Sequence, residues 1–107
     1  MIIVEKTPGE KIPYEVAGNL LMLDQQLYLN LPSYERDYDV HIDISSNEFG
    51  FLVMGTARAY VAEIDIPARE YKEVVTGEDE EGNPVTERQP QPFDIEKVTL
   101  TLWGVTA

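Results

Sequence analysis

The segment Tyr38-Asp39-Val40-His41-Ile42-Asp43-Ile44 decides the fold class, because apolar and polar residues alternate along its whole length. Successive side chains of a β-strand point to opposite faces, so this pattern is typical of an antiparallel strand with one face in a core and one in solvent. We expect the even-numbered residues to face inward, and Asp39, His41 and Asp43 to share the outward face.

Toward the N-terminus, Gly18-Asn19 and Asp24-Gln25 mark two reversals of the chain. Gly-Asn suits a two-residue primed turn, whereas Asp-Gln is a weaker turn pair, for which a longer loop is the alternative. If the second turn has two residues, Met22 lies opposite Leu27. The strands that these turns connect are residues 12–17, 20–23 and 26–31.

Toward the C-terminus, residues 49–54, 57–66 and 98–103 have strand character. In the second of these, Tyr60 should share a face with Ala62, Ile64 and Ile66. Thr99, Thr101 and Trp103 should lie opposite the Val and Leu residues of the last strand. We expect residues 77–84 to form a mobile acidic loop and residues 85–88 to return as a strand. Only residues 94–97 could form a helical turn.

These segments predict an all-β fold, either a small antiparallel sandwich or a partly open barrel of six to eight short strands with at most one helical turn. The 107 residues suffice for a single β domain, residues 1–107, that buries a core without disulfide bonds.

Composition excludes several classes of function. The chain has no Cys, which rules out thiolate chemistry, disulfide scaffolds and thiolate zinc sites. Its net charge of −12 repels phosphate backbones and anionic membranes, so we expect neither nucleic-acid nor membrane binding. Charged partners should be basic proteins or cations. The start MIIVEKTPGEK lacks the apolar stretch of a signal peptide.

Asp39, His41 and Asp43 are the only candidate metal ligands that stand out. Residues two apart on a strand lie about 6.6 Å apart, whereas a metal needs donors about 2 Å from itself. One strand could therefore supply two ligands, and a neighbouring strand would have to bring a third. Without that third ligand the face is a solvated surface, so we expect no cofactor and no metal.

Other catalytic patterns are weak, and we expect a protein that is not an enzyme. Glu63 and Asp65 have the spacing of a retaining glycosidase pair, about 5–5.5 Å, but pairs of this kind arise by chance among twenty acidic residues. A calcium loop that starts at Asp79 would place Pro84 where glycine is required. No catalytic residue is therefore predicted.

Trp103 has two interpretations. An exposed tryptophan on a strand is a typical binding anchor, with Thr99 and Thr101 beside it as interaction candidates. Alternatively, a tryptophan at the end of the last strand fills the core of a small sandwich. Of the two, we expect the core position, because a large aromatic side chain is more often buried than exposed.

The chain resembles small uncharacterised proteins encoded in prophage-like regions of bacterial genomes. The resemblance covers most of the chain and is carried by residues 12–18 (IPYEVAG), 64–71 (IDIPAREY) and 94–103 (DIEKVTLTLW). It implies a phage context near structural or tail genes, and a place in the bacterial cytoplasm or on the virion. It implies no activity.

Three hypotheses for function follow. The first is a non-enzymatic protein–protein interaction domain, in the setting of a phage structural or assembly accessory protein, that also has strand edges for self-association. The second is an acidic decoy that occupies a nucleic-acid-binding protein. The third is a metal-dependent enzyme that uses Asp39, His41 and Asp43.

Overall fold

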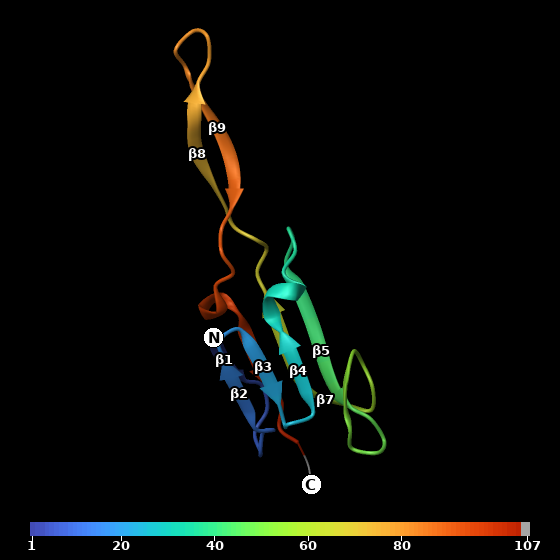
Figure 1. Ribbon diagram of the computed structural model, residues 1–107. Coiled ribbons are helices and arrows are strands. Elements are labelled where there is room, and N and C mark those ends of the chain that lie inside the picture. The colour runs from blue at the N-terminus through green and yellow to red at the C-terminus, as the bar shows by residue number, and fades with distance from the viewer. Residues whose placement is uncertain (106–107) are drawn as a thin grey trace.

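The computed structural model describes residues 1–105 and contains ten strands in three sheets (Figure 1). One sheet has the order β1 (Ile2–Glu5), β10 (Thr99–Leu102), β7 (Ala59–Ile66), β5 (Val40–Ser46) and β6 (Leu52–Met54). The second has the order β2 (Tyr14–Ala17), β3 (Leu20–Leu23) and β4 (Leu27–Asn30), and the third pairs β8 (Tyr71–Glu78) with β9 (Pro84–Pro90). Only β1 and β10 pair in parallel among these strands.

The prediction of an all-β fold is confirmed. Strands are more numerous than the six to eight expected, because β1 and β8 are additional to the predicted segments, whereas the return strand predicted over 85–88 lies within β9. The predicted helical turn is the 3-10 helix η2 (Ile95–Lys97), and a second one, η1 (Leu31–Tyr34), follows β4.

The core lies between the three-stranded and the five-stranded sheets, which therefore form a small sandwich (Figure 1). Each sheet contributes the apolar residues of one face, and burying them is the main favourable term in folding. The buried apolar residues are Ile12, Leu21, Leu23, Leu29, Leu31, Ile42, Ile44, Leu52, Val61, Ala62, Ile64, Ile66, Val98, Leu100 and Leu102.

Strand β5 has the predicted alternation, with Ile42 and Ile44 buried and His41 exposed on the opposite face. The strand begins two residues later than predicted, at Val40, and Tyr38 is exposed instead of facing the core. The chain bends before Val40, and the Asp39 side chain accepts a hydrogen bond from the Ala68 backbone amide.

The two N-terminal hairpins occur at the predicted turns, but the register of the second is shifted by one residue. Leu23 pairs with Leu27, so Met22 lies opposite Tyr28 and not opposite Leu27. Asp24 and Gln25 both have positive φ, as in a primed turn, and the loop includes one more residue than predicted. The shift places Leu21, Leu23 and Leu29 on one buried face, and this burial fixes the register.

An irregularity in the pairing of β5 with β7 moves Tyr60 away from its predicted face. Ile44 pairs with Ala62 and Ser45 with Tyr60, which leaves Val61 as an extra residue. Both Val61 and Ala62 are then buried, and Tyr60 stacks on the outer side of the sheet. Similarly, β6 begins at Leu52, so the predicted strand over 49–54 is shorter than expected.

Residues 71–90 form a hairpin that projects from the sandwich, and we call this hairpin the arm (Figure 1). The molecule measures 69 × 21 × 20 Å, and its radius of gyration is 18.8 Å. A compact chain of this length would have about 13 Å. The predicted loop over 77–84 is shorter than expected, because its ends belong to β8 and β9; its mobility stays a prediction.

The C-terminal segment closes over the N-terminal one beside the sandwich. The Gly104 backbone amide donates to the Thr7 hydroxyl (2.6 Å), and that of Val105 donates to the Glu10 carbonyl (2.7 Å). A Cβ added at Gly104 would overlap the Pro8 carbonyl oxygen. Glycine at this position therefore permits the close approach of two backbones.

Replacing Gly104 with alanine should lower the free energy of unfolding by about 1–3 kcal/mol, because the methyl group enters occupied space. Denaturant unfolding followed by circular dichroism measures the loss. Gly77→Ala is the matched control, since a Cβ there meets no atom within 4 Å. An equal loss for both variants would contradict the role of the close approach.

Candidate functional site

The outer face of the five-stranded sheet gathers polar residues in two rows. The pairing registers place His41 beside Asp65 and Thr99 in one row. The next row contains Asp43, Glu63 and Thr101. Because the same strands bury their alternate residues against the three-stranded sheet, all these side chains face outward.

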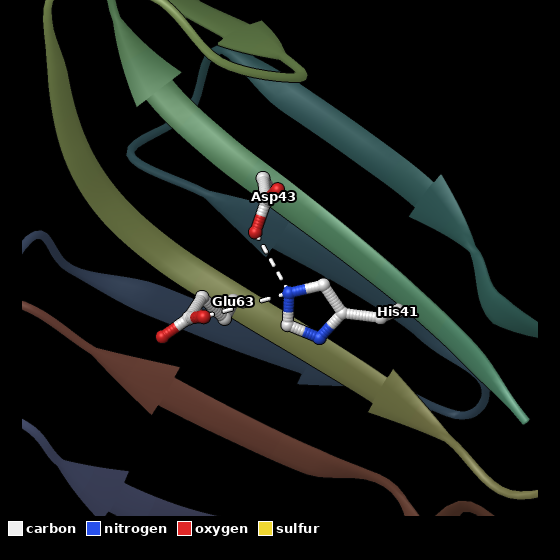
Figure 2. Close-up of side chains that lie close together, drawn as sticks. All are labelled: His41, Asp43 and Glu63. Carbon is white, nitrogen blue, oxygen red and sulfur yellow. Dashed lines mark hydrogen bonds and ion pairs between the residues drawn. The ribbon is translucent and has the colours of Figure 1, made fainter.

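His41 lies between three carboxylates, and Figure 2 shows two of them, Asp43 and Glu63, beside its ring. Its Nδ1 is 2.6 Å from Asp65 Oδ1, and its Nε2 is 2.7 Å from Asp43 Oδ1 and 3.4 Å from Glu63 Oε1. We call His41, Asp43, Glu63 and Asp65 the histidine cluster. Two residues come from β5 and two from β7, so the pairing of these strands builds it.

The carboxylates favour the protonated imidazole. The hydrogen bonds to Asp65 and then to Asp43 raise the pKa of His41 above its ordinary value, and partial desolvation opposes them only in part. With both ring nitrogens facing carboxylate oxygens, both can donate when the ring is a cation. The cluster then holds one positive and three negative charges.

The sequence prediction identified part of this arrangement. His41 and Asp43 come together as expected, and the neighbouring strand β7 supplies the third group, Glu63. Asp39 is not part of the cluster, because it precedes β5 and binds the Ala68 amide at 2.8 Å. Glu63 and Asp65, predicted to be a chance pair, are linked to His41 only by the β5–β7 register.

A shallow hollow of about 250 Å³ lies beside the cluster. Its polar lining residues are Asp39, His41, Asp65, Lys97 and Thr99. Of the three candidates predicted from the sequence, Asp39 and His41 line this hollow and Asp43 does not. Asp39 does not belong to the histidine cluster, whereas His41 and Asp43 do.

Trp103 lies on the outer face with Thr99 and Thr101, as the alternation predicts, and all three are half-buried. Its indole stacks on Tyr60 with ring centroids 5.2 Å apart, and its Nε1 donates to Glu63 Oε2 at 2.8 Å. The interpretation of Trp103 as a core residue is therefore wrong, because Trp103 is not among the residues of the core cluster. Its hydrogen bond holds Glu63 Oε2, while the other oxygen of that carboxylate, Oε1, faces His41 Nε2.

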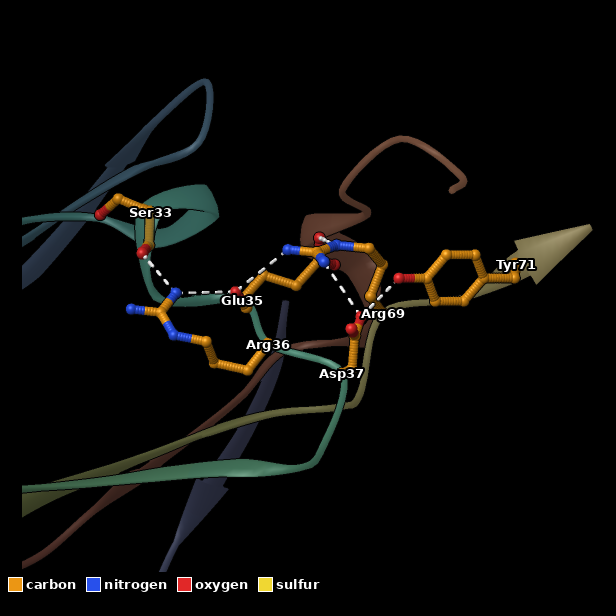
Figure 3. Close-up of polar contacts among 6 residues, drawn as sticks. All are labelled: Ser33, Glu35, Arg36, Asp37, Arg69 and Tyr71. Carbon is orange, nitrogen blue, oxygen red and sulfur yellow. Dashed lines mark hydrogen bonds and ion pairs between the residues drawn. The ribbon is translucent and has the colours of Figure 1, made fainter. Parts of the chain in front are cut away.

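The base of the arm is tied to the sandwich by a network around Arg69 (Figure 3). Arg69 donates to Glu35 Oε1 at 3.2 Å and to Asp37 Oδ1 at 3.0 Å, and the Tyr71 hydroxyl donates to the same Asp37 oxygen at 2.6 Å. The Arg88 guanidinium lies 4.4 Å from the centre of the Tyr71 ring, which links β9 to this network. The arm thus leaves the sandwich in a defined direction.

Beyond its base the arm is exposed. Every residue of β9 is exposed, and Val75 and Val85 are 63% and 43% exposed. The turn at the tip is ordered by Asp79, whose side chain accepts from the backbone amides of Glu81 and Asn83. These hydrogen bonds, that of Asn83 first, lower the pKa of Asp79, so the tip keeps its negative charge.

Three further surfaces are exposed: two sheet edges and one turn. The edge strand β1 is exposed over its whole length, and the exposed Val16 lies on β2, an edge of the other sheet. Phe49 and Phe51 lie in the turn before β6, 75% and 62% exposed. Both phenylalanines fall within the strand predicted over 49–54, but the turn at Asn47 includes them and exposes them.

Neither protein-family models, curated proteins nor solved structures give a significant match to this chain. Within residues 1–105, no helix has the length and apolar character to cross a membrane. The arm, the exposed edges and the histidine cluster are the features of the structure that bear on function.

The histidine cluster should make stability depend on pH. Because folding raises the pKa of His41 above about 6.5, its contribution is complete below that pH and is lost as pH rises through the raised value. The His41 side chain is 47% exposed, so the contribution is at most about 1 kcal/mol. We expect the stability advantage over His41→Gln to be larger at about pH 6 than at about pH 9.

An NMR titration of the single imidazole checks the cause directly. In the folded protein it should titrate above about pH 6.5, and Asp65→Asn should lower that pKa. Asp39→Asn is the control, because Asp39 makes its hydrogen bond to Ala68 and not to His41. An unshifted His41 pKa in the wild type would contradict the arrangement.

Proposed function

We propose that this protein is a non-enzymatic protein–protein interaction domain that binds its partner mainly through the arm. The observation that carries this proposal is the exposure of a hairpin that extends well beyond the sandwich (Figure 1). A two-stranded hairpin in water is marginally stable, so a partner that packs against the arm would supply stability that the core does not.

Because its base is anchored, we interpret the arm as a preformed contact surface and not as an extended loop. The Arg69 network fixes the orientation of the first residues of β8 relative to the sandwich. An element that is oriented before binding loses less conformational entropy when a partner binds it. The exposed Val75 and Val85 provide apolar anchors along its length.

The charge of the arm selects the kind of partner. Four consecutive acidic residues, Glu78 to Glu81, occupy the tip, and the whole chain carries a net charge of −12. A second copy of the chain would meet this tip with like charge, whereas a basic protein surface would complement it. We infer a protein partner with a basic groove, and the phage-like resemblance makes a structural or assembly protein the setting to test.

The decoy hypothesis has weaker support. A phosphate mimic needs carboxylates in a regular row along an extended surface, whereas the densest acidic run of this chain, Glu78 to Glu81, occupies the turn of the arm. A decoy contact would also weaken steeply with salt, because it consists of screened charges. An arm contact that includes buried valines would persist.

A pair of matched substitutions separates the arm from the strand edges. Val85→Asp on the arm should weaken binding to candidate virion proteins at least tenfold, since a carboxylate replaces an apolar anchor. Val16→Asp introduces the same change at an edge valine of similar exposure, 41% against 43%, and should change the affinity little. Sedimentation of the protein with each candidate measures both.

If Val16→Asp weakened binding more than Val85→Asp did, the contact would lie at the sheet edge. That result would contradict binding through the arm. Sedimentation of the protein alone tests self-association through strand edges. A strict monomer that binds none of the candidates would count against the whole proposal.

A further inference from the structure

We propose that the histidine cluster is a binding site for one divalent cation of the zinc type, with His41, Asp43 and Glu63 as ligands and Asp65 as the positioning residue. This site is independent of the arm and of the protein partner inferred above. The proposal starts from the geometry of the three ligand atoms on the outer face of β5 and β7 (Figure 2).

The three ligand atoms already have nearly the spacing that a cation requires. One imidazole nitrogen and two carboxylate oxygens lie within 4.8 Å of one another, and His41 Nε2 is 2.7 Å and 3.4 Å from the two oxygens. Metal bonds of about 2.0–2.2 Å in a tetrahedral arrangement separate neighbouring donors by about 3.3–3.5 Å. Small side-chain rotations suffice to admit the ion.

Asp65 is not one of the proposed ligands; it positions the His41 ring. It binds His41 Nδ1 at 2.6 Å, which fixes the ring orientation and directs Nε2 toward Asp43 and Glu63. A carboxylate behind a histidine is the usual outer support of a zinc site, because it fixes the tautomer and raises the basicity of the ligand nitrogen. Trp103 supports Glu63 in the same way, through the hydrogen bond from Nε1 to Oε2.

The charge balance also favours a cation. Elsewhere in residues 1–105, carboxylates of the arm base pair with arginine or lysine, as Glu35 does with Arg69 and Glu70 with Lys97. Asp43, Glu63 and Asp65 have ion pairs only with His41 in that part of the chain. When a divalent ion replaces the Nε2 proton, that proton is released to solvent, and the ion balances the two ligand carboxylates.

The composition of the chain makes this site simple to test. It contains one His, no Cys and one Trp, so imidazole ligation of Zn²⁺ can occur only at His41. Trp103 contacts a proposed ligand, and its fluorescence therefore reports on Glu63. A titration of the full chain with ZnCl₂ should change this fluorescence saturably, with one equivalent bound.

Variants distinguish ligation from diffuse attraction to an acidic surface. His41→Gln, Asp43→Asn and Glu63→Gln should each weaken Zn²⁺ binding at least tenfold, and Asp65→Asn about 10–100-fold. Asp39→Asn is the matched control, because it removes the same charge beside the same hollow but no ligand. Its affinity should stay within about threefold of the wild type.

NMR of the wild-type protein decides the matter even if a variant fails to fold. On addition of Zn²⁺, the His41 Nε2 resonance should shift as for a metal-bound nitrogen, while Nδ1 should keep its proton. Unchanged imidazole resonances, absence of saturable binding, or equal losses for Asp39→Asn and Asp43→Asn would each overturn the proposal.

Discussion

The structure depends on the packing of the leucine face of the three-stranded sheet against the isoleucine-rich face of β5 and β7. Leu21, Leu23 and Leu29 are almost fully buried against residues such as Ile44 and Ile64. This burial fixes strand register, because a shift of one residue would move a whole set of apolar side chains into water. The second hairpin illustrates the constraint: its turn takes an additional residue, and all three of these leucines then face the core.

The histidine cluster is a consequence of the same packing. Once Ile42, Ile44, Ile64 and Ile66 are buried, the residues that alternate with them must share the outer face, and pairing between the strands sets which of them meet. His41 thereby lies beside Asp65, and Asp43 lies beside Glu63. Four ionisable groups gather at a place where no arginine or lysine of residues 1–105 pairs with them. Such a surface is costly to assemble without a counter-charge, which is the physical basis for the proposed cation.

The arm is held together by hydrogen bonds and ion pairs and not by a buried apolar core. Its strands bury almost nothing, so they are held by their own ladder, by the ordered turn at Asp79 and by the Arg69 network at the base. The sandwich contains all the core residues and needs no contribution from the arm. A two-stranded hairpin outside a core is only marginally stable in water, which is the reason a partner is proposed for the arm.

The sequence by itself determined the all-β class, most strand positions, the outward placement of His41 and Asp43, and the acidic character of the surface. Alternation is a local property, and charge is a sum, so both can be read without coordinates. Tertiary structure alone decided that Glu63 and Asp65 lie beside His41 and that Asp39 does not. It also decided that a bulge places Tyr60 against Trp103, and that residues 71–90 lie outside the core. These outcomes depend on register and on contacts between residues far apart in the chain, which side-chain periodicity within one strand does not encode.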